Sequence, residues 1–544
     1  MADTQPSTDV TPKSPVDEAG LSVDEIQLRA QGHIGELPRQ FSAFATLSLA
    51  FSLTNSWVGY SAVFPTPLFA GGGPTVVFGL ITAMIACSFI TAGLAELASA
   101  FPSSGGQYHF AFMVSAPENR AAIAFTVGWL SVIAWCLTVA SAQIFCAQII
   151  MNLASFYNPD FEGTQWQTYL VYVGLCFIAV AVVIYLPRQI PKAEIVFFSA
   201  SILGFVVFFI TVLARSDTKQ SARTVFVEWN NQTGWGDGTA FLLGVGACMY
   251  TFLATDGATH VAEEMPNPGK GVPQAMGLTM IIGITTSFLW TMAFLFSSSD
   301  LEEVSLSYLP ILTVYYQALR SQDGAAFFAI WLFFIYYGAT ITCFVTAGRL
   351  TWAFARDNGL PYSKLIAKTH PTLKVPANAT IATAVFCILY GLIYIGSTTA
   401  FNSFISLAIL GLNVTYVIPQ AIVVIRGRDK VLPKRAFNLG PIMGPFCNIF
   451  STLWISLYTV LFCFPVFLPV TVQDMNYVSV VLVGVVLFIL VTWWAGKRHT
   501  FVGPKIDIHG LEILSAANAG TLRSSSLSAG PVTEKNATES SGAV

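Results

Sequence analysis

Charged side chains are scarce in this sequence of 544 residues: Asp, Glu, Lys and Arg make up 10% of it, against about 25% in soluble proteins. Hydrophobic residues make up 54%, and the mean hydropathy is +0.65. This balance excludes an ordinary soluble protein and predicts a membrane protein. The formal net charge of −3 leaves no basic excess for nucleic-acid phosphates, so we expect no nucleic-acid partner.

Motifs that carry catalytic chemistry are missing as well. The chain has six histidines and contains no Gly-x-Ser-x-Gly, no His-Glu-x-x-His and no nucleotide-binding Gly-x-x-x-x-Gly-Lys-Ser/Thr loop. Its nine cysteines fall in apolar runs without a Cys-x-x-Cys pair, which is typical of packing thiols. We therefore expect neither an enzyme nor a nucleotide-driven pump, and no metal or cofactor.

Long apolar runs dominate what is present. A bilayer core of about 30 Å needs about 20 apolar residues per helix, and on that measure the sequence predicts an all-α polytopic membrane protein with twelve transmembrane helices. Their expected ranges are 41–66, 74–100, 122–153, 166–186, 193–214, 239–262, 274–297, 325–353, 378–396, 401–425, 446–468 and 477–495. Together these helices are expected to form one domain, residues 41–498.

The two ends of the chain are polar. Residues 1–40 and 499–544 are predicted to be disordered tails, and the first of them carries no apolar core of a cleavable signal peptide. Lys and Arg gather in the loops that lie inside if the N-terminus is cytoplasmic, so we expect both termini in the cytoplasm. This orientation places the sequon at Asn231 outside, as a candidate for glycosylation.

Two of the predicted helices look interrupted. The first carries Ser, Thr, Asn and Gly at mid-span in the run 51–60, and the sixth does the same in the run 250–259. Irregular backbone at membrane depth survives only where it lines a cavity. The breaks lie five helices apart, as expected for inverted repeats over about 41–214 and 239–425, with peripheral helices at 446–495. The alternative is that these small residues form packing surfaces in unbroken helices.

The two breaks supply the candidate binding residues. Asp256 is the first candidate for a group that meets a substrate ammonium, because a carboxylate in lipid normally faces a cavity or a partner. Alternatively, Asp256 caps the second half-helix and touches no substrate. Trp57, Tyr60 and Phe252 offer aromatic faces suited to a quaternary ammonium, although each is alternatively a packing residue. The candidate substrate-binding residues are Asn55, Ser56, Trp57, Gly59, Tyr60, Phe252, Thr255, Asp256 and Gly257.

Charged residues near the predicted cytoplasmic helix ends are candidates for proton coupling or gating. Glu96 and His260 are placed to exchange a proton, and alternatively serve as an interfacial anchor and a structural residue. Ion pairs of a cytoplasmic gate are expected among Glu263, Glu264, Arg349 and Arg356, with solvated loop charges as the alternative. The residues selected as coupling or gate candidates are Glu96, Glu263 and Arg349.

Three long segments resemble the amino acid–polyamine–organocation superfamily. They are GLAELASAFPSSGGQY at 93–108, EEMPNP with VPQA within 263–275, and GRLTWAFARDNGLP at 348–361, which resemble the exits of the second, sixth and eighth helices of that superfamily. Shorter elements at 432–440 and 464–477 are similar to its fungal amino acid/choline transporter branch, which includes choline and GABA permeases. The resemblance covers roughly residues 35–505.

The resemblance implies the five-plus-five inverted-repeat fold with helices 1 and 6 interrupted, and a secondary transporter driven by an ion gradient, usually of protons. Many members bind a substrate carboxylate at a glycine-rich first break, whereas residues 54–59 here hold one glycine and the bulky Trp57. This departure favours choline-like cations or ω-amino acids.

The expected activity is therefore proton-coupled import of a small nitrogenous solute, either choline or an amino acid such as GABA. The alternatives are an α-amino acid, a specialised metabolite amine, or a nutrient receptor that binds without transport. The expected location is the plasma membrane, with the vacuolar membrane as the alternative.

Overall fold

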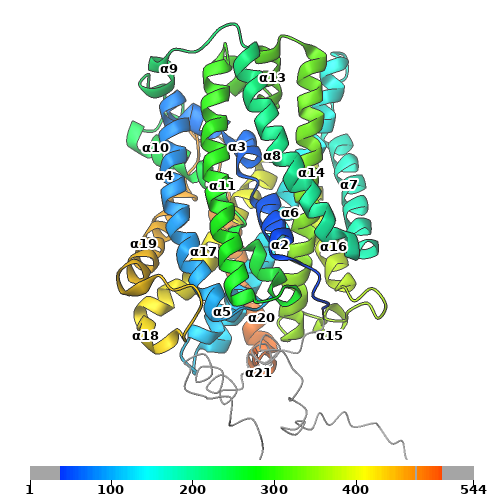
Figure 1. Cartoon of the computed structure of the whole chain (residues 1–544), viewed down its shortest axis with the longest axis vertical. Coiled ribbons are helices and arrows are strands. Elements are labelled where there is room, and N and C mark those ends of the chain that lie inside the picture. The colour runs from blue at the N-terminus through cyan, green and yellow to red at the C-terminus, as the bar shows by residue number, and fades with distance from the viewer. Residues whose placement is uncertain (1–36, 472–474, 505–544) are drawn as a thin grey trace, which may run out of the picture.

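The structure is a computed structural model that describes residues 37–471 and 475–504, and these ranges contain helices and no β-strand. Most of the two predicted tails, 1–40 and 499–544, lies outside the described residues. Figure 1 shows a bundle of long helices that run between two ends. We call one the tail end, because the described chain begins and finishes there and α5, α15, α18 and α21 lie there. The opposite end, with α9 and α13, is the loop end.

Helices make up the regular secondary structure of the described residues. In chain order they are α2 (Ala43–Thr54), α3 (Ser56–Val63), α4 (Pro65–Ala100), α5 (Gln107–Val114), α6 (Arg120–Tyr157), α7 (Gln165–Tyr185), η2 (Pro187–Gln189), α8 (Ile190–Arg215), α9 (Ala222–Phe226), α10 (Asp237–Cys248), η3 (Met249–Phe252), η4 (Thr255–Glu264), α11 (Pro268–Ser297), α12 (Leu301–Leu306), α13 (Pro310–Leu319), α14 (Gln322–Arg356), α15 (Ser363–Ile366), α16 (Ala377–Gly396), α17 (Thr398–Arg426), α18 (Arg428–Val431), α19 (Gly440–Leu461), α20 (Val478–Thr492), η5 (Trp493–Lys497) and α21 (Arg498–Thr500).

The polytopic all-α fold predicted from the apolar runs is confirmed. Eleven helical segments of the described chain are long and apolar enough to cross a membrane. The first predicted span is not among them, because it is divided into α2 and α3, each too short to span alone. The bounds predicted for the eleventh span, 446–468, are wrong, because the observed helix begins and ends six to seven residues earlier. Its helix α19 ends at Leu461, ahead of Pro465, whose ring nitrogen carries no hydrogen for a helical bond.

The break in the first span falls at Asn55, as predicted. Its backbone has φ 31° and ψ 57°, in the left-handed region that Asn tolerates better than other side chains. The side chain holds this conformation in place, because Asn55 Oδ1 accepts a hydrogen bond of 2.7 Å from Ser201 Oγ on α8. The break is therefore fixed by a residue from the fifth span.

The break in the sixth span falls at Leu253 and Ala254. The α-helix α10 tightens into the 3₁₀ turn η3, Leu253 is extended, and Ala254 takes φ 66° in the left-handed region. This conformation is strained for alanine, and such strain gathers at functional sites. The predicted break residue Gly257 lies three positions further on, where a Cβ atom would come within 2.1 Å of Leu53 Cδ1. Gly257 thus permits close packing of η4 on α2.

The two broken spans lie side by side in opposite directions. The first half of one span, α2, packs on the second half of the other, η4, while α3 packs on η3. The breaks consequently meet at one level in the bundle. The long helices α8, α11 and α14 pack on α2, and α11 also runs beside α4 on the face shown in Figure 1.

Candidate substrate site

A small cavity lies where the two breaks meet. Its volume is about 30 Å³, which is room for about one or two water molecules. The lining residues come from both breaks, from α6 and from α14, and are Leu53, Thr54, Asn55, Gly59, Thr138, Ala142, Tyr250, Leu253, Ala254, Tyr336, Ala339 and Cys343. We call this space the central cavity. Its position between two broken helices is where transporters of this architecture hold their substrates.

A larger cavity of about 460 Å³ lies between the central cavity and the loop end. We call it the outer cavity. No charged side chain is among the described residues that line it, and six of them are the aromatic residues Phe145, Tyr250, Tyr336, Tyr458, Phe462 and Phe464. A solute that arrives from the loop end therefore meets aromatic rings, hydroxyl groups and amides.

Two tyrosines separate these cavities. Tyr250 and Tyr336 each line both spaces, and their hydroxyl oxygens are 3.1 Å apart, within hydrogen-bond distance. Ser141 Oγ on α6 lies 3.4 Å from the Tyr250 hydroxyl. The two cavities thus share a wall made by a pair of side chains whose hydroxyl groups are joined by a neutral hydrogen bond.

The structure separates the nine predicted binding residues into two groups. Asn55 and Gly59 line the central cavity. Trp57 and Tyr60 lie outside its lining: Trp57 Nε1 donates to Ser201 Oγ at 3.0 Å, and the Tyr60 hydroxyl donates to the carbonyl oxygen of Val76 at 2.6 Å. The remaining five predicted binding residues are also buried and also lie outside this lining; they are Ser56, Phe252, Thr255, Asp256 and Gly257.

Asp256 is fully buried and is surrounded by hydrogen-bond donors. Its Oδ2 atom accepts from Gln107 Nε2 at 2.7 Å and from Trp135 Nε1 at 3.2 Å. Its Oδ1 atom accepts from the hydroxyl of Tyr416 at 2.6 Å. These donors belong to α5, α6 and α17, so one carboxyl group ties η4 to three other elements.

His260 contacts the same carboxyl group. The ring nitrogen Nδ1 lies 3.0 Å from the carbonyl oxygen of Ser104, and Nε2 lies 3.0 Å from Asp256 Oδ2. A carbonyl oxygen only accepts, so Nδ1 carries a hydrogen. His260 thus links the backbone at Ser104 to the carboxyl group of Asp256.

Two buried ion pairs lie at the tail end of α14. Arg349 on α14 pairs with Glu264 at the end of η4, where its Nη2 atom lies 3.0 Å from Oε2. Arg356, two turns further along α14, makes two bonds of 3.0 Å to Glu263. The side chains of both glutamates are 1% exposed. The structure thus brings together the four charged residues that the sequence placed at one end of the bundle.

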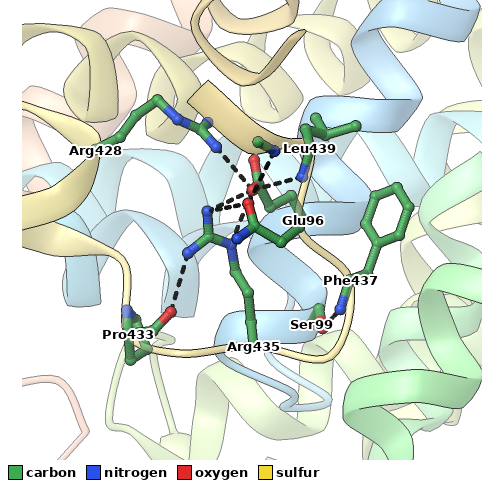
Figure 2. A network of polar contacts seen from close by, with 9 residues as sticks. Glu96, Ser99, Arg428, Pro433, Arg435, Phe437 and Leu439 are labelled. Atoms are coloured by element: carbon green, nitrogen blue, oxygen red, sulfur yellow. Dashed lines mark hydrogen bonds and ion pairs between the residues drawn. The ribbon is translucent and has the colours of Figure 1, made fainter. Parts of the chain in front are cut away.

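Glu96, the remaining gate candidate, lies in a second cluster at the tail end (Figure 2). Its Oε1 atom accepts from Arg428 Nη2 at 2.7 Å, from Arg435 Nε at 2.8 Å and from the backbone N–H of Leu439 at 3.1 Å. The partners belong to the segment between α17 and α19. Glu96 therefore fastens the end of α4 to the connection that leads into the peripheral helices.

Asp357 directly follows the last residue of α14, at the tail end. Burial raises the pKa of Asp357 to about 6, although the charge of Arg356 opposes this shift. The hydroxyl of Tyr108 on α5 donates to Asp357 Oδ2 at 2.9 Å. On the same helix, burial lowers the pKa of His109 to about 3, so this ring is neutral at physiological pH.

Several lining residues of the central cavity gave no signal in the sequence. Thr138, Tyr336 and Cys343 lie within long regular helices, α6 and α14, that show no interruption. Tyr250 stands in the interrupted run 250–259, and its aromatic side chain beside the break is a signal that the sequence does contain. The helix face of Tyr336 follows only from the packing.

The fold and the cavities define a polytopic secondary transporter with two broken helices around a central site. The chain belongs to the amino acid permease family, which it matches over residues 41–488. The resemblance noted in the sequence is therefore confirmed, and so are the transporter class and the multi-pass membrane location.

Curated relatives match the chain over most of its length. A choline transporter of Saccharomyces cerevisiae is 34% identical over 475 residues, which cover 86% of this chain and 84% of the relative. An uncharacterized amino-acid permease of Schizosaccharomyces pombe is 30% identical over 491 residues, 89% of this chain and 90% of the relative. A swainsonine transporter of Arthroderma benhamiae is 29% identical over 479 residues, 85% of this chain and 92% of the relative.

The tail-end ion pair yields a stability prediction. Arg349→Met should lower the free energy of unfolding by about 3–5 kcal/mol, because it leaves Glu264 buried without its cation. The double variant Arg349→Met/Glu264→Met should recover most of that loss, since no charge then remains unpaired. Thermal midpoints of the purified protein in lipid nanodiscs measure both effects.

Arg223→Met is the matched control, because the pair that Arg223 forms with Glu228 is exposed. It should leave the midpoint close to that of the wild type. A double variant as unstable as Arg349→Met alone would show that the ion pair itself, and not the stranded carboxylate, stabilises the tail end.

Proposed function

We propose that this protein transports a small cationic or zwitterionic amine, with choline as the first candidate, from the loop end to the tail end of the bundle. The observation that carries the proposal is the outer cavity, an uncharged space lined by six aromatic residues that leads to the central cavity. Aromatic faces attract a quaternary ammonium, and more strongly when it is desolvated. A lining without Arg or Lys offers no charged partner to an anionic solute.

The half-helix ends supply the second part of the recognition. The helix α2 ends at Thr54, beside the central cavity, and η3 ends one residue before Leu253, which also lines it. Helix C-terminal ends carry partial negative charge on their carbonyl groups and favour cations. A solute ammonium in the central cavity would therefore be held by these carbonyl groups and by the rings of Tyr250 and Tyr336.

Asp256 has a positioning role in this proposal. Its carboxyl group is paired with His260 and with three further donors, and it lies outside the lining of both cavities. It would hold the sixth-span break in shape, while Asn55 and Gly59 border the solute. Asp256→Asn should then reduce transport of all solutes alike. A selective rise in KM for cations would instead place Asp256 in direct contact with the solute.

The relatives support an amine substrate and leave a second candidate. The chain shares 34% of aligned residues with a choline transporter, and it also matches a swainsonine transporter and amino-acid permeases. The second candidate is accordingly an amino acid such as GABA, whose carboxylate would meet the N-terminal end of α3 at the same break.

The coupling ion and the orientation belong to the same proposal. Protons would drive import across the plasma membrane, with the tail end in the cytoplasm and the loop end outside. In that orientation the ion pairs Glu264–Arg349 and Glu263–Arg356 form the inner gate and the Tyr250–Tyr336 pair forms the outer one.

Uptake measurements test the substrate. A yeast strain without its own carriers, expressing this protein, should take up radiolabelled choline saturably, and faster from acidic than from neutral medium. The same cells are offered GABA and a panel of α-amino acids. Uptake of GABA alone would contradict the cation preference, and binding of choline without uptake would identify a receptor.

Thiol labelling tests the tyrosine barrier. A methanethiosulfonate reagent with a trimethylammonium group resembles choline and would reach Cys343, in the central cavity, only when the barrier opens. Tyr336→Phe should raise the labelling rate of Cys343 about fivefold, because it removes a neutral hydrogen bond worth about 1 kcal/mol. Mass spectrometry of the peptide that contains Cys343 gives the rate.

The control is the neighbouring tyrosine. The hydroxyl of Tyr337 donates to Leu175 at 2.7 Å and lines neither cavity, so Tyr337→Phe should leave the labelling of Cys343 unchanged. Protection by added choline should slow the labelling in the wild type. Equal rates in the two variants would show that the barrier lies elsewhere.

Glycosylation tests the orientation. Asn231 lies in the connection between α9 and α10, at the loop end. Expression in a eukaryotic host should give a protein whose mass falls on treatment with peptide N-glycosidase, and Asn231→Gln should abolish that fall. The sequon at Asn378, at the tail-end start of α16, is the control, and Asn378→Gln should change nothing. Loss of the glycan in Asn378→Gln would show that the tail end, and not the loop end, lies outside the cell.

A further inference from the structure

One buried carboxyl group stands apart from the others in the described part of the bundle. Glu194 lies near the start of α8 and is fully buried. The other buried glutamates, Glu96, Glu263 and Glu264, each bond to an arginine, and Asp256 bonds to His260. Glu194 instead accepts from a hydroxyl group, that of Thr342 on α14.

The charged groups around Glu194 are few. The titratable groups that act on it electrostatically are Arg349 and Cys343, both on α14. Arg349 lies two helical turns from Thr342 along α14, and its guanidinium group is already bonded to Glu264. From α2 the buried hydroxyl of Ser52 faces the carboxyl group, and on α8 itself Lys192 is exposed. A carboxylate in such surroundings is costly, and neutralisation by a proton relieves the cost.

The hydroxyl of Thr342 matches both protonation states of Glu194. Its Oγ1 atom lies 2.9 Å and 3.0 Å from the two carboxyl oxygens and 2.9 Å from the carbonyl oxygen of Gly338. A hydroxyl group donates one hydrogen and accepts through its lone pairs. With Glu194 ionised, Thr342 donates to it. With Glu194 protonated, the acid O–H donates to Thr342, which turns its own hydrogen to Gly338.

Glu194 is connected to the central cavity through both of its neighbours. Thr342 directly precedes Cys343, which lines the cavity. Ser52 lies on α2 just before Thr54 and Asn55, which form the first break and line the same cavity. In the other direction along α14 lies Arg349, half of the tail-end ion pair. Glu194 therefore stands between the solute site and the inner gate.

We propose that Glu194 is the proton-binding group that couples solute movement to the proton gradient. The inference rests on the proposed transport function, since the proton it carries accompanies the solute. Uptake forms one O–H bond at the carboxyl group with a proton from water, and release breaks the same bond.

Proton movement in proteoliposomes tests the coupling. Wild-type protein reconstituted in liposomes that enclose a pH-sensitive dye should acidify the interior when choline is added outside. Glu194→Gln, which imitates the protonated acid, should exchange labelled for unlabelled choline across the membrane at a rate near that of the wild type, without acidification. Its choline exchange should also lose its dependence on pH. Glu118→Gln, at an exposed loop glutamate, is the matched control and should acidify like the wild type.

A second variant, at Thr342, tests the same proposal in case Glu194→Gln does not fold. Thr342→Val keeps the shape of the side chain and removes the hydroxyl that stabilises the ionised carboxylate. It should retain coupled transport and move the pH midpoint of uptake to more alkaline values. An unchanged midpoint would contradict the role assigned to the Thr342–Glu194 pair.

A measurement without solute separates this inference from the proposed function. Infrared difference spectra of the purified protein in lipid, between acidic and alkaline buffer, should show a protonated-carboxyl band that Glu194→Gln lacks. If the band is present and choline is not transported, proton binding by Glu194 stands and the proposed substrate fails. A spectrum identical in wild type and Glu194→Gln overturns the inference, as does choline-driven acidification that persists in Glu194→Gln or a requirement for sodium instead of protons.

Discussion

Backbone groups inside a membrane have no water to bond, and each unsatisfied one costs several kcal/mol. The arrangement of this protein depends on that constraint, because two of its spans are broken at mid-depth. The break at Asn55 is held by Ser201, from α8. The break at Ala254 is followed by Asp256, whose four partners come from α5, α6, α17 and η4 itself. The scaffold helices therefore fix the shape of the site and pack around it.

The two ends of the bundle are closed by different chemistry. At the tail end, four charged side chains pair in two buried ion pairs, and separating a buried pair costs several kcal/mol. Toward the loop end, the barrier is one hydrogen bond between Tyr250 and Tyr336, worth about 1 kcal/mol. In the proposed transport cycle, the barrier toward the loop end would therefore open more easily than the one at the tail end, whose ion pairs must first be weakened.

Local sequence patterns predicted the spans and both interruptions, because apolar length and clusters of small polar residues are properties of short segments. They also identified Asn55 and Gly59, which stand in the first break. The patterns did not identify Thr138, Tyr336 or Cys343, since the face that a regular helix turns to a cavity depends on its neighbours. Asp256 attracted attention by its charge, but its four donors are separated from it by up to 160 residues, and only the folded chain shows them. The sequence did not identify Glu194 as a candidate, because it stands a few residues after a loop, where a charged residue is expected to be exposed.

The cluster around Glu96 has a consequence for the order in which the chain is made. Glu96 and Arg435 are 339 residues apart, so ribosomes adding about 5–20 residues per second complete the cluster roughly half a minute after Glu96 has been synthesised. During that interval α4 ends in a carboxylate without its arginine partners. The segment between α17 and α19 thus completes the contact with α4 late in synthesis, after the ten spans that precede it in the chain.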